Sequence, residues 1–303
     1  MTFPLHGLYE VIETNPGVFV LIPDDVRDPD GDPQFNRRTN AGFIVTDAGA
    51  IVVNTMNTPF RARELLYEIR RRTDLPVRYV INTDAHPDLV LGNEVFMAEK
   101  SAIISTIPAA AEMREYAEDL RRQVSRDENW RIRRRMRGIH PTAPTQTFDT
   151  ELRIKLGGEE IRVVRVAGGH SDGDAVVVAS QQKVAFLGHL FEGGFFPRLD
   201  QSDLPRWIEL LKELESWDVE TYVPAHGPPG GKKELAEFRR YLEWVLNEVS
   251  TRVAEGKSLS DVKRELKVTE TYRWSSRELA AHAIEEIFQQ VSGGQDPPPE
   301  SQD

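Results

Sequence analysis

Short apolar runs separated by polar, turn-forming residues mark the first 230 positions of the chain. The runs are rich in Val and Ile, and this pattern is typical of buried strands. The turn Asp47-Ala48-Gly49 between two of them predicts a hairpin. The predicted strands cover 17–22, 42–46, 50–53, 77–81, 161–166, 175–179, 184–187 and 221–223.

Helical spacing of apolar residues appears between these strands and dominates after them. Leu204, Trp207, Ile208 and Leu211 would share one face of an amphipathic helix, and Ser258 or Ser260 is a candidate N-cap further on. The predicted helices cover 61–72, 108–138, 204–214, 232–249, 258–266 and 276–291. Because strands and helices alternate in the first part of the chain, an α/β architecture is expected.

Composition limits the chemistry and the partners. The net charge of −11 argues against nucleic-acid and membrane partners, because both need a basic surface. The chain has no cysteine, so any metal ion must be held by His and carboxylate ligands. The start shows no basic segment followed by an apolar one, and no apolar run is long enough to span a bilayer. A cytoplasmic location is therefore expected.

Four of the seven histidines share one context. Each follows an apolar run by a few residues and is predicted to lie in a loop with Gly or Pro, where α/β proteins place reactive side chains. Asp84 and Asp88 flank the first of these histidines. Neutral imidazole and carboxylate are ligands for zinc and similar ions, so a metal site is predicted from His86, His170, His189 and His226 with these two aspartates.

Several segments, in order along the chain, resemble the motifs of the metallo-β-lactamase superfamily. The segment 82–89 resembles its H-x-H-x-D-H motif, and 167–174, 186–190 and 223–228 resemble its later elements. Upstream, 40–43 and 52–55 fit its early hairpin. The resemblance implies a four-layer αββα sandwich over 1–230. The helical pattern after it predicts a C-terminal helical extension over 231–292 packed on the same domain, and the composition of 293–303 predicts a disordered tail.

Three substitutions set the chain apart from the family motif. Asp84 replaces the first histidine, Leu89 replaces the last, and His189 replaces the aspartate that bridges two metal ions. Leucine cannot ligate a metal, whereas the other two changes keep ligand-competent side chains. The second site of the family is therefore weakened, and the first gains a carboxylate.

Two arrangements of the ligands remain open. In one, Asp84, His86 and His170 hold an ion, with His189 as a candidate fourth ligand. In the other, His189 and His226 join Asp88 around a second ion. One tightly bound ion is expected, because the bridging carboxylate that helps neutralise two adjacent ions is absent. Zinc is expected from the family resemblance, and iron is the alternative, because two histidines and a carboxylate also form the non-haem iron triad.

The resemblance implies a metallohydrolase that acts through a metal-bound water on a small ester, thioester, lactone or amide. Asp88 is the candidate to orient the water and accept its proton, and His226 or His189 would stabilise an oxyanion or protonate the leaving group. Two other functions stay open: an iron-dependent oxygenase of sulfur compounds, and an inactive scaffold or binding protein. A small-molecule substrate is the expected partner, and the C-terminal helices would suit a pocket cap or a homodimer interface.

Overall fold

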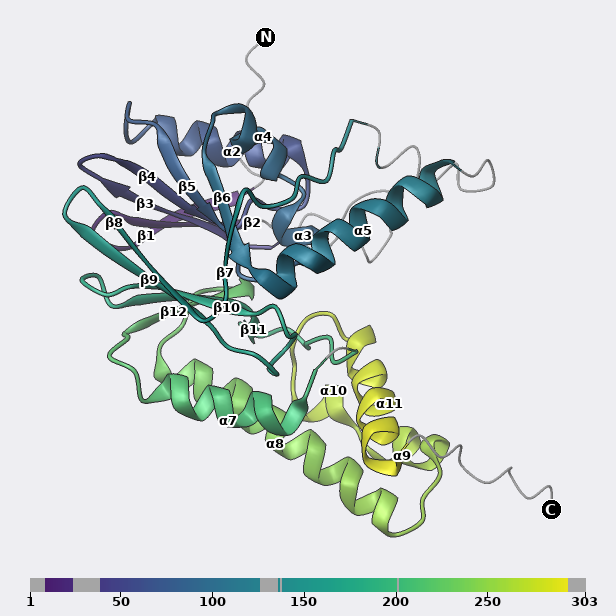
Figure 1. Cartoon of the computed structure of the whole chain (residues 1–303). Coiled ribbons are helices and arrows are strands. Elements are labelled where there is room, and N and C mark those ends of the chain that lie inside the picture. Colours follow the sequence, from purple (N-terminus) through teal and green to yellow (C-terminus); the bar gives the residue numbers. More distant parts are fainter. Residues whose placement is uncertain (1–8, 24–38, 126–135, 137, 201, 294–303) are drawn as a thin grey trace.

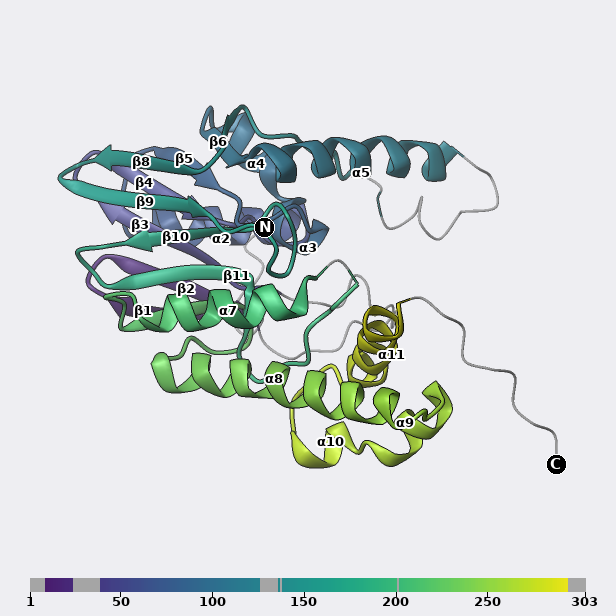
Figure 2. The ribbon, with the colours of Figure 1, turned by 60° about the horizontal axis from the view of Figure 1, so that its bottom comes forward.

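Two β-sheets lie face to face between two layers of helices (Figures 1 and 2). The computed structural model describes residues 9–23, 39–125, 136, 138–200 and 202–293. Its strands are β1 (Tyr9–Asn15), β2 (Val18–Pro23), β3 (Ala41–Thr46), β4 (Gly49–Val53), β5 (Val77–Ile81), β6 (Ala102–Thr106), β7 (Gln146–Phe148), β8 (Glu151–Leu156), β9 (Glu159–Arg165), β10 (Ala175–Ala179), β11 (Val184–Glu192) and β12 (Thr221–His226). Its helices are α2 (Pro59–Arg70), α3 (Pro87–Val90), α4 (Asn93–Ala98), α5 (Ile107–Ser125), α7 (Leu204–Glu215), α8 (Lys232–Ala254), α9 (Leu259–Glu265), α10 (Val268–Thr271) and α11 (Glu278–Ser292).

Each sheet combines antiparallel and parallel pairing. Strands β1 to β7 form the first sheet in sequence order, antiparallel as far as β4 and parallel from β4 to β7. The second sheet has the order β12-β11-β10-β9-β8, and only the pair β11 and β12 is parallel. Parallel strands end at the same sheet edge, so β4 to β6 and β11 with β12 each bring their carboxyl ends together.

Alternating side chains divide the apolar residues between the layers. In β4, Ile51 and Val53 belong to the core between the sheets, whereas Ala50 and Val52 pack on the outer side with α2. Successive side chains of a strand point to opposite faces. Strands that are apolar on both faces are therefore covered on both sides, and the predicted αββα sandwich is confirmed.

The C-terminal helices share the core that covers the second sheet. Val176 of β10, Trp207 of α7, Phe238 of α8 and Ile284 of α11 belong to one buried cluster. Figure 2 shows α7 and α8 along this sheet, with α9, α10 and α11 beyond one end. The division into 1–230 and 231–292 stays a prediction, and the proposed tail lies outside the described residues from position 294 onward.

The sequence located most elements but made two strands that bear on the site, β11 and β12, too short. The predicted strands 77–81 and 175–179 coincide with β5 and β10, and Ser258 is the N-cap of α9. The predicted strand 184–187 was too short, because β11 runs on to Glu192. His189 therefore lies inside a strand, and His226 is the last residue of β12, so the expectation of loops was wrong for both. The predicted helix 108–138 is observed as far as Ser125, and 126–135 lie outside the described residues.

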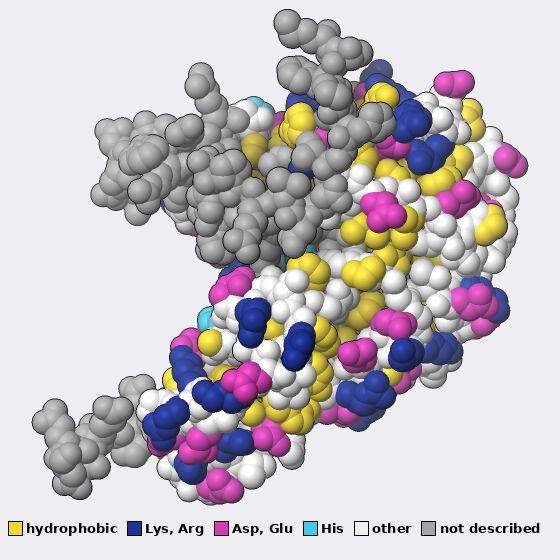
Figure 3. Space-filling model, turned by 180° about the vertical axis from the view of Figure 1, so that it is seen from behind, with side chains coloured by type: hydrophobic (Ala, Val, Ile, Leu, Met, Phe, Trp, Pro, Cys, Tyr) yellow, Lys and Arg dark blue, Asp and Glu magenta, His cyan; other side chains and the backbone are white. Residues whose placement is uncertain are grey.

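The visible surface carries charges of both signs. On the face shown in Figure 3, basic and acidic side chains are interspersed over the lower part of the molecule. Some charged side chains of the molecule form ion pairs, among them Lys257 Nζ with Glu265 Oε1 at 2.8 Å. Within the described part of the chain, none of the helices combines the length and the apolar character needed to cross a membrane.

Candidate metal centre

The segment that carries Asp84 is fixed by a buried polar network beyond the end of β5. Thr83 forms two backbone hydrogen bonds in this network. Its N–H donates to Asn54 Oδ1 at 3.0 Å, and its carbonyl accepts from Ala175 N at 2.7 Å. Asn82 and Asn93 exchange two side-chain hydrogen bonds of 3.1 and 2.9 Å. Asp84 follows, almost fully buried. A fully paired network of this kind rigidifies its surroundings, so Asp84 is held at a defined position.

Asp84 also organises the next turn of the chain. Its Oδ1 accepts a 2.9 Å hydrogen bond from the backbone N–H of His86, an Asx-type turn that directs the chain into α3. Pro87 occupies the first turn of that helix, as its fixed φ favours. Asp88 lies one residue further on, and its carbonyl accepts a short hydrogen bond from Thr39 Oγ1.

His170 is the best-supported imidazole of the site. Its Nδ1 lies 3.2 Å from Asp174 Oδ1, and Asp174 itself accepts hydrogen bonds from Ser171 N and Oγ, both at 2.7 Å. The edge of Trp207 lies against the His170 ring, with centroids 5.8 Å apart. A carboxylate on one ring nitrogen fixes the tautomer and leaves the other nitrogen to a metal ion. Asp174 is not among the residues that the sequence predicted for the site, so this orienting role was missed.

A distortion of β11 brings His189 to Asp84. The register with β12 shifts on both sides of Gly188, which has a φ of +55°. A Cβ at Gly188 would lie 2.2 Å from Thr83 Oγ1, so only glycine allows this close approach. His189 Nδ1 consequently lies 3.0 Å from Asp84 Oδ2. Irregularities of this type re-aim side chains next to active sites.

His226 is positioned by hydrogen bonds between the two sheets. Asn40, just before β3, donates from Nδ2 to the carbonyls of Pro224 at 3.1 Å and Gly227 at 2.7 Å. Its backbone N–H donates to Ala225 O at 2.7 Å. His226 Nε2 lies 3.5 Å from Asp88 Oδ2, and its ring lies beside Phe195, with centroids 5.7 Å apart.

The structure brings all six predicted ligands together, in two groups. Ligand atoms of the first group, Asp84, His86, His170 and His189, lie within 4.8 Å of one another, as do those of the second group, Asp88, His189 and His226. We call these the first and second clusters. Within the first cluster, the centroids of the three imidazole rings are 4.6 to 5.0 Å apart.

Burial and neighbouring charges shift the pKa values of these groups. Burial lowers the pKa of His170, which favours its neutral, ligand-competent form. Burial also disfavours a charged His189, but the carboxylates of Asp84 and Asp88 outweigh it and raise the pKa of His189 well above its usual value. Burial would raise the pKa of both aspartates, yet His189 keeps them well below their usual range. Both carboxylates are therefore ionised.

The donor set fits a divalent metal ion. Each cluster offers imidazole nitrogens together with a buried carboxylate, which is the composition of zinc and related sites that lack cysteine. The carboxylate of Asp174 behind His170 is the outer support that metal-ligating histidines usually have.

Comparison with known proteins places this chain in a family. The model of the metallo-beta-lactamase superfamily matches residues 36–226, well over half of the chain. The chain belongs to this superfamily. The predicted membership is confirmed.

Individual relatives are distant. A linear primary-alkylsulfatase from Pseudomonas sp. (strain ATCC 19151) is 23% identical over 242 residues, which are 65% of this chain and 43% of that protein. The chain thus spans less than half the length of that relative. A metallo-beta-lactamase structure from Pontibacter korlensis has a TM-score of 0.62 at 21% identity, covering 78% of this chain and 99% of the other. The sec-alkylsulfatase Pisa1 from Pseudomonas sp. has a TM-score of 0.72 at 16% identity, covering 97% of this chain and 52% of the other. At these identities the structures show a shared fold.

The chain departs most from the metallo-β-lactamase motif at Leu89. This residue is fully buried and belongs to an apolar cluster with Ala85, Val90, Ala109 and Met113. Its side chain therefore contributes packing where the family motif has a ligand. The other two departures, Asp84 and His189, lie in contact with each other in the first cluster.

The phenylalanines that follow His189 have mixed roles. Phe191 and Phe196 are buried in the core, where they pack on Phe238 and on Tyr241 respectively. Phe195, in contrast, lies beside the ring of His226. Arg198, further along the same segment, pairs with Asp200 at 3.3 Å.

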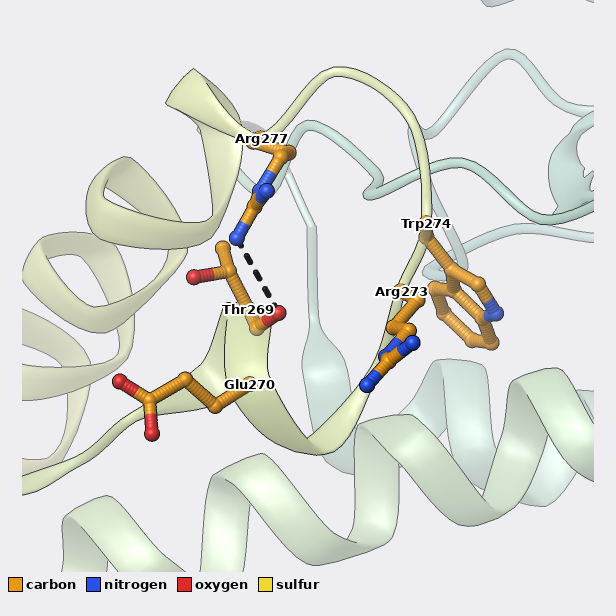
Figure 4. A pocket seen from close by; sticks show the side chains of 5 residues that line it. All are labelled: Thr269, Glu270, Arg273, Trp274 and Arg277. Carbon is orange, nitrogen blue, oxygen red and sulfur yellow. Dashed lines mark hydrogen bonds between the residues drawn. The ribbon is translucent and has the colours of Figure 1, made fainter.

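A separate pocket of about 600 Å³ opens between α10 and the start of α11 (Figure 4). Arg277 Nη2 donates to Thr269 O at 3.3 Å there, while Trp274 forms the opposite side. The pocket is lined by Thr269, Glu270, Arg273, Trp274 and Arg277, and so includes none of the six predicted ligands. Ser275, next to Trp274, donates its N–H to Gly194 O at 2.9 Å, which ties the edge of this pocket to the segment that carries Phe195.

Proposed function

We propose that this chain is a metal-dependent hydrolase of a small ester, thioester, lactone or amide, in which a single ion in an altered site activates water. The observation that carries the proposal is the first cluster, where a buried carboxylate and three imidazoles converge within 4.8 Å. The contact between Asp174 and His170 also supports the proposal, because a carboxylate on one ring nitrogen fixes the tautomer that a metal-ligating histidine needs.

Asp84, His86 and His170 would hold the ion. A bound divalent ion lowers the pKa of a coordinated water from about 16 to near 7 and so supplies the nucleophile at neutral pH. Asp88 Oδ2 faces His189 and His226, at 3.5 Å from each, so its Oδ1 is the atom assigned to accept the proton of the water. His226 is assigned to protonate the leaving group, and His189 to stabilise the developing oxyanion.

Zinc is the proposed metal, since imidazole and carboxylate with an open position for water form a hydrolytic zinc site. Iron is the alternative. Asp84, His86 and His170 also provide the two-histidine, one-carboxylate set of oxygen-activating iron enzymes.

The substrate is proposed only as a class. Two of the relatives above are alkylsulfatases, so alkyl sulfate esters belong in a substrate screen beside carboxylic esters, thioesters, lactones and amides. Phe195 beside His226 offers an apolar surface for the non-reacting part of such a molecule. A homodimer stays a prediction.

The test is turnover of this screen by protein loaded with zinc or with iron, before and after a chelator. We expect zinc-loaded protein to hydrolyse at least one ester class, chelator to abolish turnover, and added zinc to restore it. His170→Ala should remove the activity. Asp172→Ala is the matched control, because this exposed neighbour lies outside both clusters.

The three functions give different results. Iron-dependent oxygen consumption without hydrolysis would favour the oxygenase. Hydrolysis that survives both chelator and His170→Ala would refute metal-dependent hydrolysis. A scaffold would show no turnover and no change in thermal stability on chelation.

A further inference from the structure

The imidazole of His189 faces both clusters, with a different nitrogen toward each. Its Nδ1 lies 3.0 Å from Asp84 Oδ2 in the first cluster. Its Nε2 lies 3.5 Å from Asp88 Oδ2 in the second. His189 is also the residue that the two groups of ligands have in common.

The surrounding structure holds the ring in this position. Gly188 places the backbone of β11 against Thr83, and the register shifts around it turn the His189 side chain between the two aspartates. The ring of His170 stacks on it at 4.8 Å, and that of His226 lies at 5.4 Å on the other side. If the ring turned away from this position, His189 would lose its contact with Asp84 or its contact with Asp88.

We propose that His189 bridges two metal ions, one bound at Nδ1 with Asp84, His86 and His170, and the other at Nε2 with Asp88 and His226. The inference rests on the proposed function. Binding of the two ions replaces both ring protons of His189, one at each nitrogen, and both protons leave to solvent, as metal binding to a protonated ligand requires. Each ring nitrogen then donates one lone pair to one ion.

An imidazole bridge sets the spacing of the ions. The two ring nitrogens are about 2.2 Å apart and each zinc–nitrogen bond adds about 2.0 to 2.1 Å, so the ions would lie about 6 Å apart. In two-metal hydrolytic sites the spacing is about 3.5 to 4 Å, short enough for both ions to act on one reaction centre. At about 6 Å a single water cannot contact both ions. The second ion would therefore not share the water of the first ion. When it is bound, Asp88 and His226 serve as its ligands, so the acid–base roles proposed for them belong to the form with only the first cluster filled.

The experiment is anomalous X-ray diffraction at the zinc edge on crystals of the full chain, stripped with chelator and reloaded with zinc alone. We expect two ions on opposite sides of the His189 ring, about 6 Å apart. Two ions about 3.5 to 4 Å apart, or His189 bound to one ion only, would overturn the bridge.

A substitution at the bridge provides the matched comparison. His189→Asp introduces the carboxylate of the family motif and should shorten the spacing to about 3.5 to 4 Å. An unchanged spacing in this variant would show that His189 does not set it. If this variant does not fold, His226→Ala is the second comparison, and equilibrium dialysis should show one zinc ion fewer per chain with the first cluster still filled.

Failure of the bridge can be told apart from failure of the proposed function. A single zinc ion on Asp84, His86 and His170, with hydrolysis retained, would refute the bridge and leave the hydrolase proposal standing. Absence of zinc from both clusters would refute both.

Discussion

The first and second clusters share His189, yet they are supported very differently. In the first, Asp84 accepts from the backbone of His86 and from His189, and Asp174 holds His170. The second has three ligand residues, and both of its histidines face the same carboxylate oxygen, Asp88 Oδ2. Its support comes from the side chains of Thr39 and Asn40, which donate hydrogen bonds to the backbone carbonyls of Asp88 and Gly227.

The difference shows where the altered motif still favours a metal ion. In the first cluster, the loss of a histidine at position 84 is offset by a carboxylate of compatible position, and the outer contacts are intact. In the second, Leu89 adds only packing. Buried carboxylates and imidazoles cost stability unless they are paired or hold a metal ion. The first cluster gathers such groups and also has the outer contacts that orient its ligands, so it is the proposed hydrolytic site.

The largest effect is expected from removing a ligand of the first cluster. Asp84→Ala and His170→Ala should each lower zinc-dependent turnover by about a thousandfold or more, since the ion that activates the water is lost. Asp172→Ala should keep wild-type turnover. Steady-state hydrolysis of the best substrate measures the effect, and a loss of less than about tenfold would place the hydrolytic ion elsewhere.

A smaller loss is expected at Asp88, with a different signature. Asp88→Asn removes the proposed proton acceptor but leaves the first cluster complete, so turnover should fall by about a hundred- to ten-thousandfold. Zinc in the first cluster should remain, as judged by metal analysis after dialysis. Loss of that zinc would instead make Asp88 a ligand of the hydrolytic ion.

Asp174 tests the outer support of the first cluster. Asp174→Ala frees the tautomer of His170 and should weaken zinc binding by about 10- to 100-fold. Competition with a chromophoric chelator measures the affinity. An unchanged affinity would assign Asp174 to the local turn alone.

Asn40 tests the support of the second cluster, with the smallest effect. Asn40→Ala leaves the buried carbonyls of Pro224 and Gly227 without their partner, and we expect a loss of about 1 to 3 kcal/mol in the free energy of unfolding. Zinc affinity of the first cluster should not change. Denaturant unfolding, combined with the same chelator competition, separates the two readouts.

The sequence was most informative where a signal is local. The strand that precedes Asp84 and the spacing of Asp84, His86 and Asp88 are read from neighbouring positions. The structure confirms the strand and places Asp84 and His86 in the first cluster and Asp88 in the second. The orienting role of Asp174 was missed, although an aspartate four residues after a predicted ligand was a usable signal.

Contacts between distant segments could not be predicted in this way. Asn40 bonds to residues 184 and 187 positions away, and no periodicity encodes such a pairing. The position of His189 depends on register shifts in β11, which interrupt the alternation that strand prediction assumes. The apolar residues Leu190 and Phe191 after His189 were the visible sign that the strand continues.

The central claim is that the altered motif still binds a metal ion, and metal content tests it most directly. Protein purified without added metal should be analysed for zinc and iron, together with Asp84→Ala and His170→Ala. We predict about one equivalent of metal in the wild-type chain and a loss of most of it in both variants. Less than about a tenth of an equivalent in the wild-type chain, unchanged by either substitution, would contradict the account.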